Sequence, residues 1–371
     1  MINQNRIVDE FIKYVKISSP TKSEGKFAQF IKLELESLGL DVIIDDAGPK
    51  AGSDTGNLVA KLKGTVEGDP ILFSCHMDTV SPSIDIKPLI KDGVIYSDGT
   101  TILGGDNKAG IAAVVEAIKV IKEDNIDHGP LEISFSIFEE GGLHGAKNLD
   151  YTKFESKRAF VLDSGGNPGQ IIVKGPAQDK INVTITGTPA HAGVAPEEGV
   201  SAIMVAAKAI DNMQLLRIDE ETTANIGVIN GGSVTNIVTP EVTIQAEARS
   251  LDNEKLDMQS RHMAKCFEDA AKEYGAKVNV EITRMYSAFS VDHDDVIVDI
   301  VREACKNIGL TSTIESSGGG SDTNVFNAMG LKAINLGIGE KKPHTLEEHL
   351  HIKDLVKVSE LIIEIIKLHV K

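Results

Sequence analysis

Short runs of apolar residues alternate along the chain with longer segments in which apolar residues recur every three or four positions. Three runs rich in β-branched and aromatic side chains are typical of buried strands: ILFSC (71–75), LEISFSIF (131–138) and RAFVL (158–162). Four segments have the apolar spacing and length of helices: 3–17, 24–39, 108–124 and 352–369. The alternation predicts an α/β domain with a mostly parallel central sheet and helices on both faces.

The order of elements changes near residue 176. The pattern there predicts strand, helix, strand, strand, helix and strand, at 179–187, 197–213, 225–231, 241–250, 253–274 and 277–285. This βαββαβ order is the ferredoxin-like arrangement. The α/β pattern then resumes with a helix at 291–309 and a strand at 332–339. We therefore expect a discontinuous core domain, 1–175 and 286–371, and an inserted α+β lid domain, 176–285.

Composition limits the possible partners. A length of 371 residues suits two domains. The net charge of −17 argues against nucleic acid or an anionic membrane as a partner, because both bind basic surfaces. No apolar stretch approaches the ~20 residues of a spanning helix, and residues 1–17 lack a signal-peptide core. The three scattered cysteines suggest no disulfide framework, and we expect a cytoplasmic protein.

Acidic and imidazole side chains stand at or just past the ends of apolar runs. They are His76 with Asp78, Asp106, Glu139 with Glu140, Asp163 and His344. In open α/β sheets the ligand crevice lies at the carboxyl ends of the strands. This nitrogen and oxygen set suits two Zn²⁺ ions that share a carboxylate, although Co²⁺ or Mn²⁺ would also be held. The pattern predicts a metal-dependent hydrolase.

His76 and Asp78 lie two residues apart on a strand and so share a face. A metal-binding imidazole needs its other ring nitrogen held by an acceptor, which Asp78 can supply. An ordinary polar strand end would look the same. Cys75 would point to the opposite face, and we expect it to be a buried structural thiol.

The other acidic residues also have two interpretations. Asp106, between a Gly turn and a helix start, is either an N-cap or a carboxylate that bridges cations ~3.5–4 Å apart. Adjacent carboxylates such as Glu139 and Glu140 repel each other unless a cation is near, although a solvated strand end would also carry them. We expect Glu140 to bind metal and Glu139 to remain free as the general base.

With the remaining ligands, each metal ion would have one imidazole ligand and one terminal carboxylate ligand. His76 pairs with Asp163, Glu140 pairs with His344, and Asp106 is shared. Three other histidines rival these ligands, and we expect them to lie on the surface or behind the site: His144, His349 and His351.

The inserted domain and a Gly-rich loop add candidates for substrate binding. His191 in GTPAHAG lies in a turn of small residues that is poorly suited to core packing. Asn236 in SVTNIVTP and Arg249 in EARS can bind a carboxylate or a developing oxyanion, although Arg249 could also be an ordinary solvated residue. The loop SSGGGSDTN (316–324) lacks the GK[ST] ending of a phosphate-binding loop. We interpret it as a backbone wall that contacts substrate through Gly319 and Gly320.

Six segments, taken in order, resemble the dizinc metallopeptidase clan of aminoacylase, carboxypeptidase G and peptidase T. They are SCHMDTV, LGGDNKAG, FSIFEEGGLHGAKNL, FVLDSGG, GTPAHAG and HTLEEH. SSGGGSDTN, TNIVTPEV and EEGGLHGAK favour the peptidase T (aminotripeptidase) branch. The resemblance implies the metal pairing given above, with Asp106 bridging, Asp78 orienting His76 and Glu139 as general base.

The same resemblance implies that His191 stabilises the tetrahedral oxyanion, commonly from a partner subunit. Arg249 and Asn236 would grip the terminal carboxylate of the substrate. We expect a zinc-dependent exopeptidase acting on short peptides, as a homodimer formed through the lid domain, whose edge strands could pair across a two-fold axis. The alternatives are a zinc-dependent deacylase of N-acyl amino acids and a non-catalytic, metal-stabilised interaction protein.

Overall fold

The computed structural model describes residues 1–370, which form two compact units. Unit 2 comprises Gly175–Phe289 and Ser317–Gly320, and unit 1 comprises the remaining described residues. The boundaries between the two units fall after residues 174 and 289, whereas the sequence predicts domain boundaries after residues 175 and 285. The short loop Ser317–Gly320 groups with unit 2, whereas the sequence predicts it to be part of the core domain.

The sheet of unit 1 has the order β1-β2-β6-β3-β7-β16-β8-β14, and β15 pairs with β8. Its four central strands are mutually parallel: β6 (Leu131–Ser136), β3 (Ile71–His76), β7 (Arg158–Ser164) and β16 (Lys332–Gly337). The flanking strands are β1 (Asp41–Ile44), β2 (Leu58–Leu62), β8 (Gln170–Gly175), β14 (Phe289–Ser290) and β15 (Thr313–Ser316). The predicted mostly parallel sheet is confirmed, and the carboxyl ends of its central strands meet at one edge.

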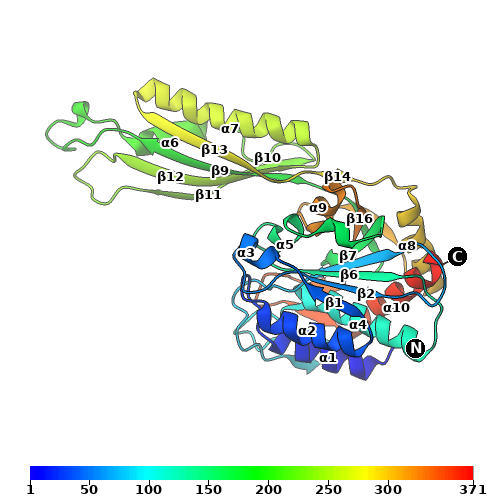
Figure 1. The fold of residues 1–371 in the computed structure, drawn as a ribbon. Coiled ribbons are helices and arrows are strands. Elements are labelled where there is room, and N and C mark those ends of the chain that lie inside the picture. The colour runs from blue at the N-terminus through cyan, green and yellow to red at the C-terminus, as the bar shows by residue number, and fades with distance from the viewer. Residues whose placement is uncertain (371) are drawn as a thin grey trace. The chain divides into compact units, whose positions relative to one another are not determined.

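Helices cover both faces of this sheet, as predicted (Figure 1). On one face α4 packs against β3 and β7, and α1 and α10 pack against α4. On the other face α9 packs against β7 and β16, with α5 beside it. The helices of unit 1 are α1 (Gln4–Lys16), α2 (Gly25–Ser37), α3 (Ala47–Ala51), α4 (Gly105–Glu123), α5 (His144–Lys147), α8 (Val296–Asn307), α9 (Asp322–Ala328) and α10 (Ile352–His369), with a 3-10 turn at Tyr151–Lys153.

A small antiparallel sheet that the sequence analysis missed lies in unit 1. Its order is β17 (Glu340–Lys341), β18 (His349–His351), β5 (Val94–Tyr96) and β4 (Leu89–Lys91). Strands of two or three residues are too short to show a period in the sequence. This sheet joins the segment before α4 to the segment that carries His344.

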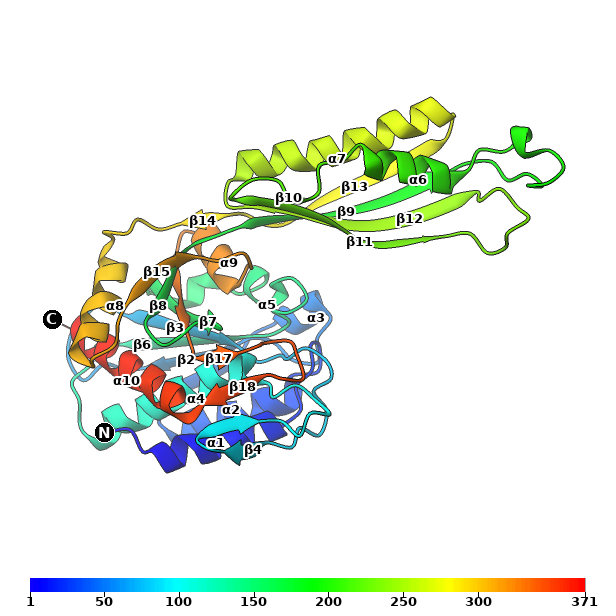
Figure 2. The same cartoon turned by 180° about the vertical axis from the view of Figure 1, so that it is seen from behind.

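Unit 2 is an antiparallel sheet of order β10-β11-β12-β9-β13, with α6 and α7 on one face (Figure 2). Its elements are β9 (Ala177–Thr186), α6 (Ala202–Asp211), β10 (Leu216–Arg217), β11 (Thr222–Gly231), β12 (Glu241–Ser250), α7 (Asn253–Tyr274) and β13 (Lys277–Tyr286), with a 3-10 turn at Pro196–Glu198. Apart from the extra β10, this is the predicted ferredoxin-like order. The helix expected at 197–213 begins later because Ser201 caps it, accepting a hydrogen bond from the Met204 amide.

All three cysteines are free and buried. Cys75 is 1% exposed, and burial raises the pKa of its thiol well above the usual value, which confirms the expected buried thiol. Among residues 1–370, no helix combines the length and the apolar content needed to cross a bilayer.

Candidate metal centre

The predicted ligands converge at the carboxyl edge of the unit 1 sheet. His76 ends β3, Asp163 lies near the end of β7, and Glu140 follows β6. Asp106 is the second residue of α4, and His344 lies in the turn between β17 and β18. Elements far apart in the sequence therefore deliver five ligand candidates to one edge.

His76 is held by both ring nitrogens and is 1% exposed. Its Nδ1 lies 2.9 Å from the backbone oxygen of Asp78, and its Nε2 lies 2.8 Å from Asp106 Oδ1 and 3.3 Å from Asp163 Oδ1. Because a carbonyl oxygen can only accept, Nδ1 carries a proton, so Nε2, which faces the two carboxylates, is the ring nitrogen that would bind a metal. The atom that orients His76 is therefore the backbone oxygen of Asp78, since the Asp78 carboxylate is 3.5 Å away.

The carboxylate of Asp78 instead holds the backbone of the two glutamates. Its Oδ1 accepts from the Glu139 amide at 2.9 Å, and its Oδ2 accepts from the Glu140 amide at 3.2 Å. Thr21 Oγ1 donates to the same Oδ2 at 2.9 Å. Asp78 thus fixes the backbone of the turn that carries both glutamates.

Asp106 has a histidine at each carboxylate oxygen. Its Oδ1 faces His76, and its Oδ2 lies 3.2 Å from His344 Nε2. His344 Nε2 is also 3.0 Å from Glu140 Oε1. The possible ligand atoms of His76, Asp106 and Glu140 all lie within 4.8 Å of one another, which is close enough for a metal ion to be held.

Asp163 is positioned by two asparagines that the sequence analysis missed. Asn107 Nδ2 donates to Asp163 Oδ1 at 2.8 Å. Asn335 accepts from the Asp163 amide and donates to its carbonyl oxygen, both at 2.9 Å. A polar residue inside the apolar strand KAINLG was the signal that could have identified Asn335.

The site concentrates buried negative charge. Burial and like-charged neighbours raise the pKa of Glu139 well above its usual value, and the pKa of Glu140 is also raised, mainly by burial. Burial raises the pKa of Asp163 to about 7. Burial opposes the charged ring of His76, but Asp163 and Asp106 raise its pKa well above the usual value. Cations would relieve this crowding, and the nitrogen and oxygen donors fit zinc.

The three rival histidines have other neighbours. His349 stacks on Tyr96 with ring centroids 5.3 Å apart, and His351 lies 5.9 Å from His349. His144 stacks on Phe138 at 4.4 Å. These contacts agree with the surface or supporting roles expected for the three side chains.

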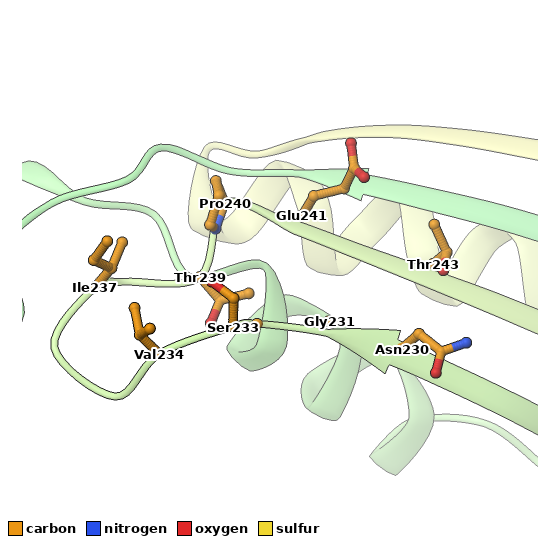
Figure 3. Close-up of a pocket in the computed structure, with 10 residues that line it drawn as sticks. Asn230, Gly231, Ser233, Val234, Ile237, Thr239, Pro240, Glu241 and Thr243 are labelled. Carbon is orange, nitrogen blue, oxygen red and sulfur yellow. The ribbon is translucent and has the colours of Figure 1, made fainter.

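Two of the substrate-binding candidates meet at one end of unit 2. His191 forms an isolated bridge with Ile237, and the Ala192 amide donates to the Asn236 carbonyl at 2.9 Å. A pocket of about 350 Å³ lies at the turn between β11 and β12, and Val234 and Ile237 of that turn are among the residues that line it (Figure 3). His191 and Asn236 therefore belong to one surface of unit 2.

Arg249 lies at the opposite end of β12. Its Nε and Nη2 donate to Glu247 at 3.0 and 3.1 Å, and its Nη1 lies 3.4 Å from the Gly318 carbonyl oxygen. Burial works against the charge of Arg249, but the bonds to Glu247 raise its pKa. A Cβ on Gly320 would lie 2.2 Å from the Tyr286 ring, so only glycine fits there. The structure thus brings the predicted Arg249 and the Gly-rich loop together.

Comparisons with known proteins cover nearly the whole chain. The profile described as peptidase family M20/M25/M40 matches residues 72–368. The uncharacterized protein YqjE of Bacillus subtilis is 47% identical over 367 residues, which is 99% of each chain. The crystal structure of aminopeptidase PepT from Bacillus cereus matches with a TM-score of 0.94 at 47% identity and covers 100% of both chains. That of a tripeptidase from Staphylococcus aureus matches with a TM-score of 0.97 at 42% identity, over 100% of this chain and 99% of that one.

Proposed function

The chain belongs to peptidase family M20/M25/M40, and on that premise we propose that it is a zinc-dependent, peptidase T-like exopeptidase that cleaves the amino-terminal residue from short peptides, with tripeptides preferred. The observation that carries the proposal is the position of Asp106, which has a histidine at each oxygen, beside the glutamate pair. A site that held metal only for stability would need no additional buried carboxyl group such as Glu139.

Five side chains of unit 1 would hold two zinc ions. His76 and Asp163 would bind one ion, Glu140 and His344 the other, and Asp106 both. The ions would lower the pKa of a water toward about 7 and polarise the carbonyl of the scissile bond.

Glu139 would act as the general base. It would accept a proton from the attacking water on its carboxylate and then pass that proton to the leaving amine. Asp78 supports this role because it fixes the Glu139 amide at 2.9 Å and so sets the direction of the side chain. Burial is the largest cause of the raised pKa of Glu139, and a general base that works near neutral pH needs its pKa shifted in this direction.

Hydrolysis of a substrate panel tests the proposal. Zinc-loaded enzyme is given di-, tri- and tetrapeptides with free amino termini, and N-acetyl and N-succinyl amino acids. We expect release of the amino-terminal residue, fastest from tripeptides. Cleavage of the acyl amino acids alone would move the chain to the deacylase alternative with the same metals and base. No hydrolysis despite bound metal would favour the non-catalytic alternative.

The geometry of unit 2 bears on how substrate is held. Glu241 and Arg249 are separated along β12 by about 26 Å, at a rise of ~3.3 Å per residue, and Asn236 lies in the loop that precedes Glu241. One carboxylate cannot contact Arg249 and Asn236 of the same chain. We therefore propose that two different chains contribute Arg249 and the pair His191 and Asn236 to each substrate, with His191 and Asn236 supplied by the partner subunit, as the family resemblance implies for His191.

Exposed apolar side chains support a homodimer through unit 2. Val194, Met204 and Val234 are 75%, 52% and 52% exposed, and Val234 lies in the same loop as Asn236. Within the described chain, β11 pairs along its length with β12, and on its other edge only Thr223 and Ala224 pair, with β10. Such an open edge can pair with a second copy. A cytoplasmic location remains a prediction.

Mixing two inactive variants tests the shared site. His191→Ala and Arg249→Ala should each abolish most peptide hydrolysis, because each removes one contact to every substrate. Mixed under conditions that exchange subunits, they should regain partial activity, since a heterodimer has one site with both residues intact. Activity is measured before and after exchange, with each variant alone as the control. No recovery in a mixture shown to contain heterodimers would contradict the arrangement.

A further inference from the structure

Glu348 is a buried carboxylate that belongs neither to the proposed metal ligands nor to the general base. It lies four residues after His344 and directly before β18, and it is 1% exposed. A buried glutamate requires hydrogen-bond donors or cations, because removing its charge from water is costly.

Four consecutive backbone amides provide those donors. Glu348 Oε2 accepts from the Leu103 amide at 2.8 Å and the Gly104 amide at 3.0 Å. Glu348 Oε1 accepts from the Gly105 amide at 2.5 Å and the Asp106 amide at 3.3 Å. These residues are 242 to 245 positions away in the sequence, so the contact ties two distant segments together.

These four amides need a carboxylate. Gly104 has a φ of +74°, and residues 103–106 enter α4 through a turn that points successive N–H groups to one side. A buried N–H group without an acceptor destabilises the folded protein. An ionised carboxylate has about four acceptor sites, which matches the four donors. A glutamine would offer one acceptor oxygen and place an NH₂ group against N–H donors.

The turn held by Glu348 ends at Asp106, the residue with a histidine at each oxygen. The segment that contains Glu348 also carries His344, and within it the Glu348 amide donates to the Thr345 carbonyl at 3.1 Å. Glu348 therefore links the backbone of one ligand candidate to the segment that bears another.

We propose that Glu348 is a positioning residue: by binding the amides of residues 103–106 it aims the Asp106 carboxylate so that both of its oxygens reach the metals. The inference rests on the proposed dinuclear site and extends it to a residue outside the ligand set. Partners that orient metal ligands typically contribute 10–100-fold in metal affinity or activity.

The test compares Glu348→Gln with wild type by three measurements: metal affinity in competition with a chelator, the visible spectrum of the Co²⁺-loaded protein, and kcat and KM on a cleaved peptide. We expect metal affinity weaker by about 10–100-fold, a shifted Co²⁺ spectrum, a lower kcat and an unchanged KM. A role limited to general stability would leave the Co²⁺ spectrum and kcat of the folded protein unchanged.

Gly105→Ala provides an independent variant that keeps the carboxylate. A Cβ at this position would lie 3.0 Å from Glu348 Oε1 and so push it away from its donors. We expect the same defects in milder form. If circular dichroism shows that Glu348→Gln does not fold, the measurements on Gly105→Ala alone test the positioning role of Glu348.

The matched control is Glu347→Gln, because Glu347 is the exposed neighbour and pairs with Lys342. It should match wild type in all three measurements. A folded Glu348→Gln protein, or failing that Gly105→Ala, with wild-type metal affinity, Co²⁺ spectrum and kcat would overturn the proposal. Metal binding is measured apart from hydrolysis, so a wrong substrate class would leave this test intact, whereas a wild type that binds no metal would refute the proposed function itself.

Discussion

Glu139→Gln should lower kcat for peptide hydrolysis by about 10²–10⁴-fold while the protein keeps its metals. The amide that replaces the carboxylate cannot accept the proton of the attacking water. The metal ligands stay in place, because the Glu139 and Glu140 amides remain held by Asp78. Steady-state kinetics on a cleaved tripeptide and metal analysis of the same sample measure both effects.

Glu67→Gln is the control for this prediction, since Glu67 is an exposed residue of unit 1. It should retain wild-type kcat and metal content. A Glu139→Gln protein with wild-type turnover would remove Glu139 from the mechanism. A variant that lost metal as well as turnover would instead place Glu139 among the ligands.

Asp106→Ala should release metal from both halves of the site. The substitution removes the carboxylate whose two oxygens face His76 and His344, so each metal would lose a ligand. We expect metal binding at least about 100-fold weaker and a correspondingly large loss of peptide hydrolysis. Elemental analysis after dialysis against a weak chelator gives the metal content.

Asp9→Ala, a change at an exposed position in α1, should keep the metal content of the wild type and is the control. Retention of both metals by Asp106→Ala would show that the aspartate does not bridge them. Loss of one metal only would place Asp106 on a single metal and leave the other half of the site independent.

The long elements could be predicted from the sequence because their periods are unambiguous. The observed bounds of β12, α7 and α10 are the ones predicted, 241–250, 253–274 and 352–369. β4, β5, β17 and β18 could not be predicted, because two or three residues carry no period and their pairing joins segments far apart in the chain.

The ligand candidates could be located because each follows a recognisable strand or precedes a helix. The residues that hold those ligands could not. Glu348, Asn107 and Asn335 act through contacts with distant residues, and nothing in their local sequence names the partner. The backbone oxygen of Asp78 orients His76, whereas the sequence suggested its side chain. The separation of Arg249 from Asn236 was also unforeseeable, because it depends on which end of β12 each residue lies near.

The distribution of the site along the chain has a consequence for biosynthesis. His76 is made early, whereas His344 and Glu348 are made after the whole of Gly175–Phe289 has been translated. Because those residues are continuous in sequence and have their own core, they can fold on the ribosome before the metal centre is complete. A nascent chain that stops before residue 344 has neither the last ligand nor the residue that holds the Asp106 turn. Metal capture would therefore follow synthesis of the segment that carries His344 and Glu348, and products truncated before it would remain metal-poor and open to proteolysis.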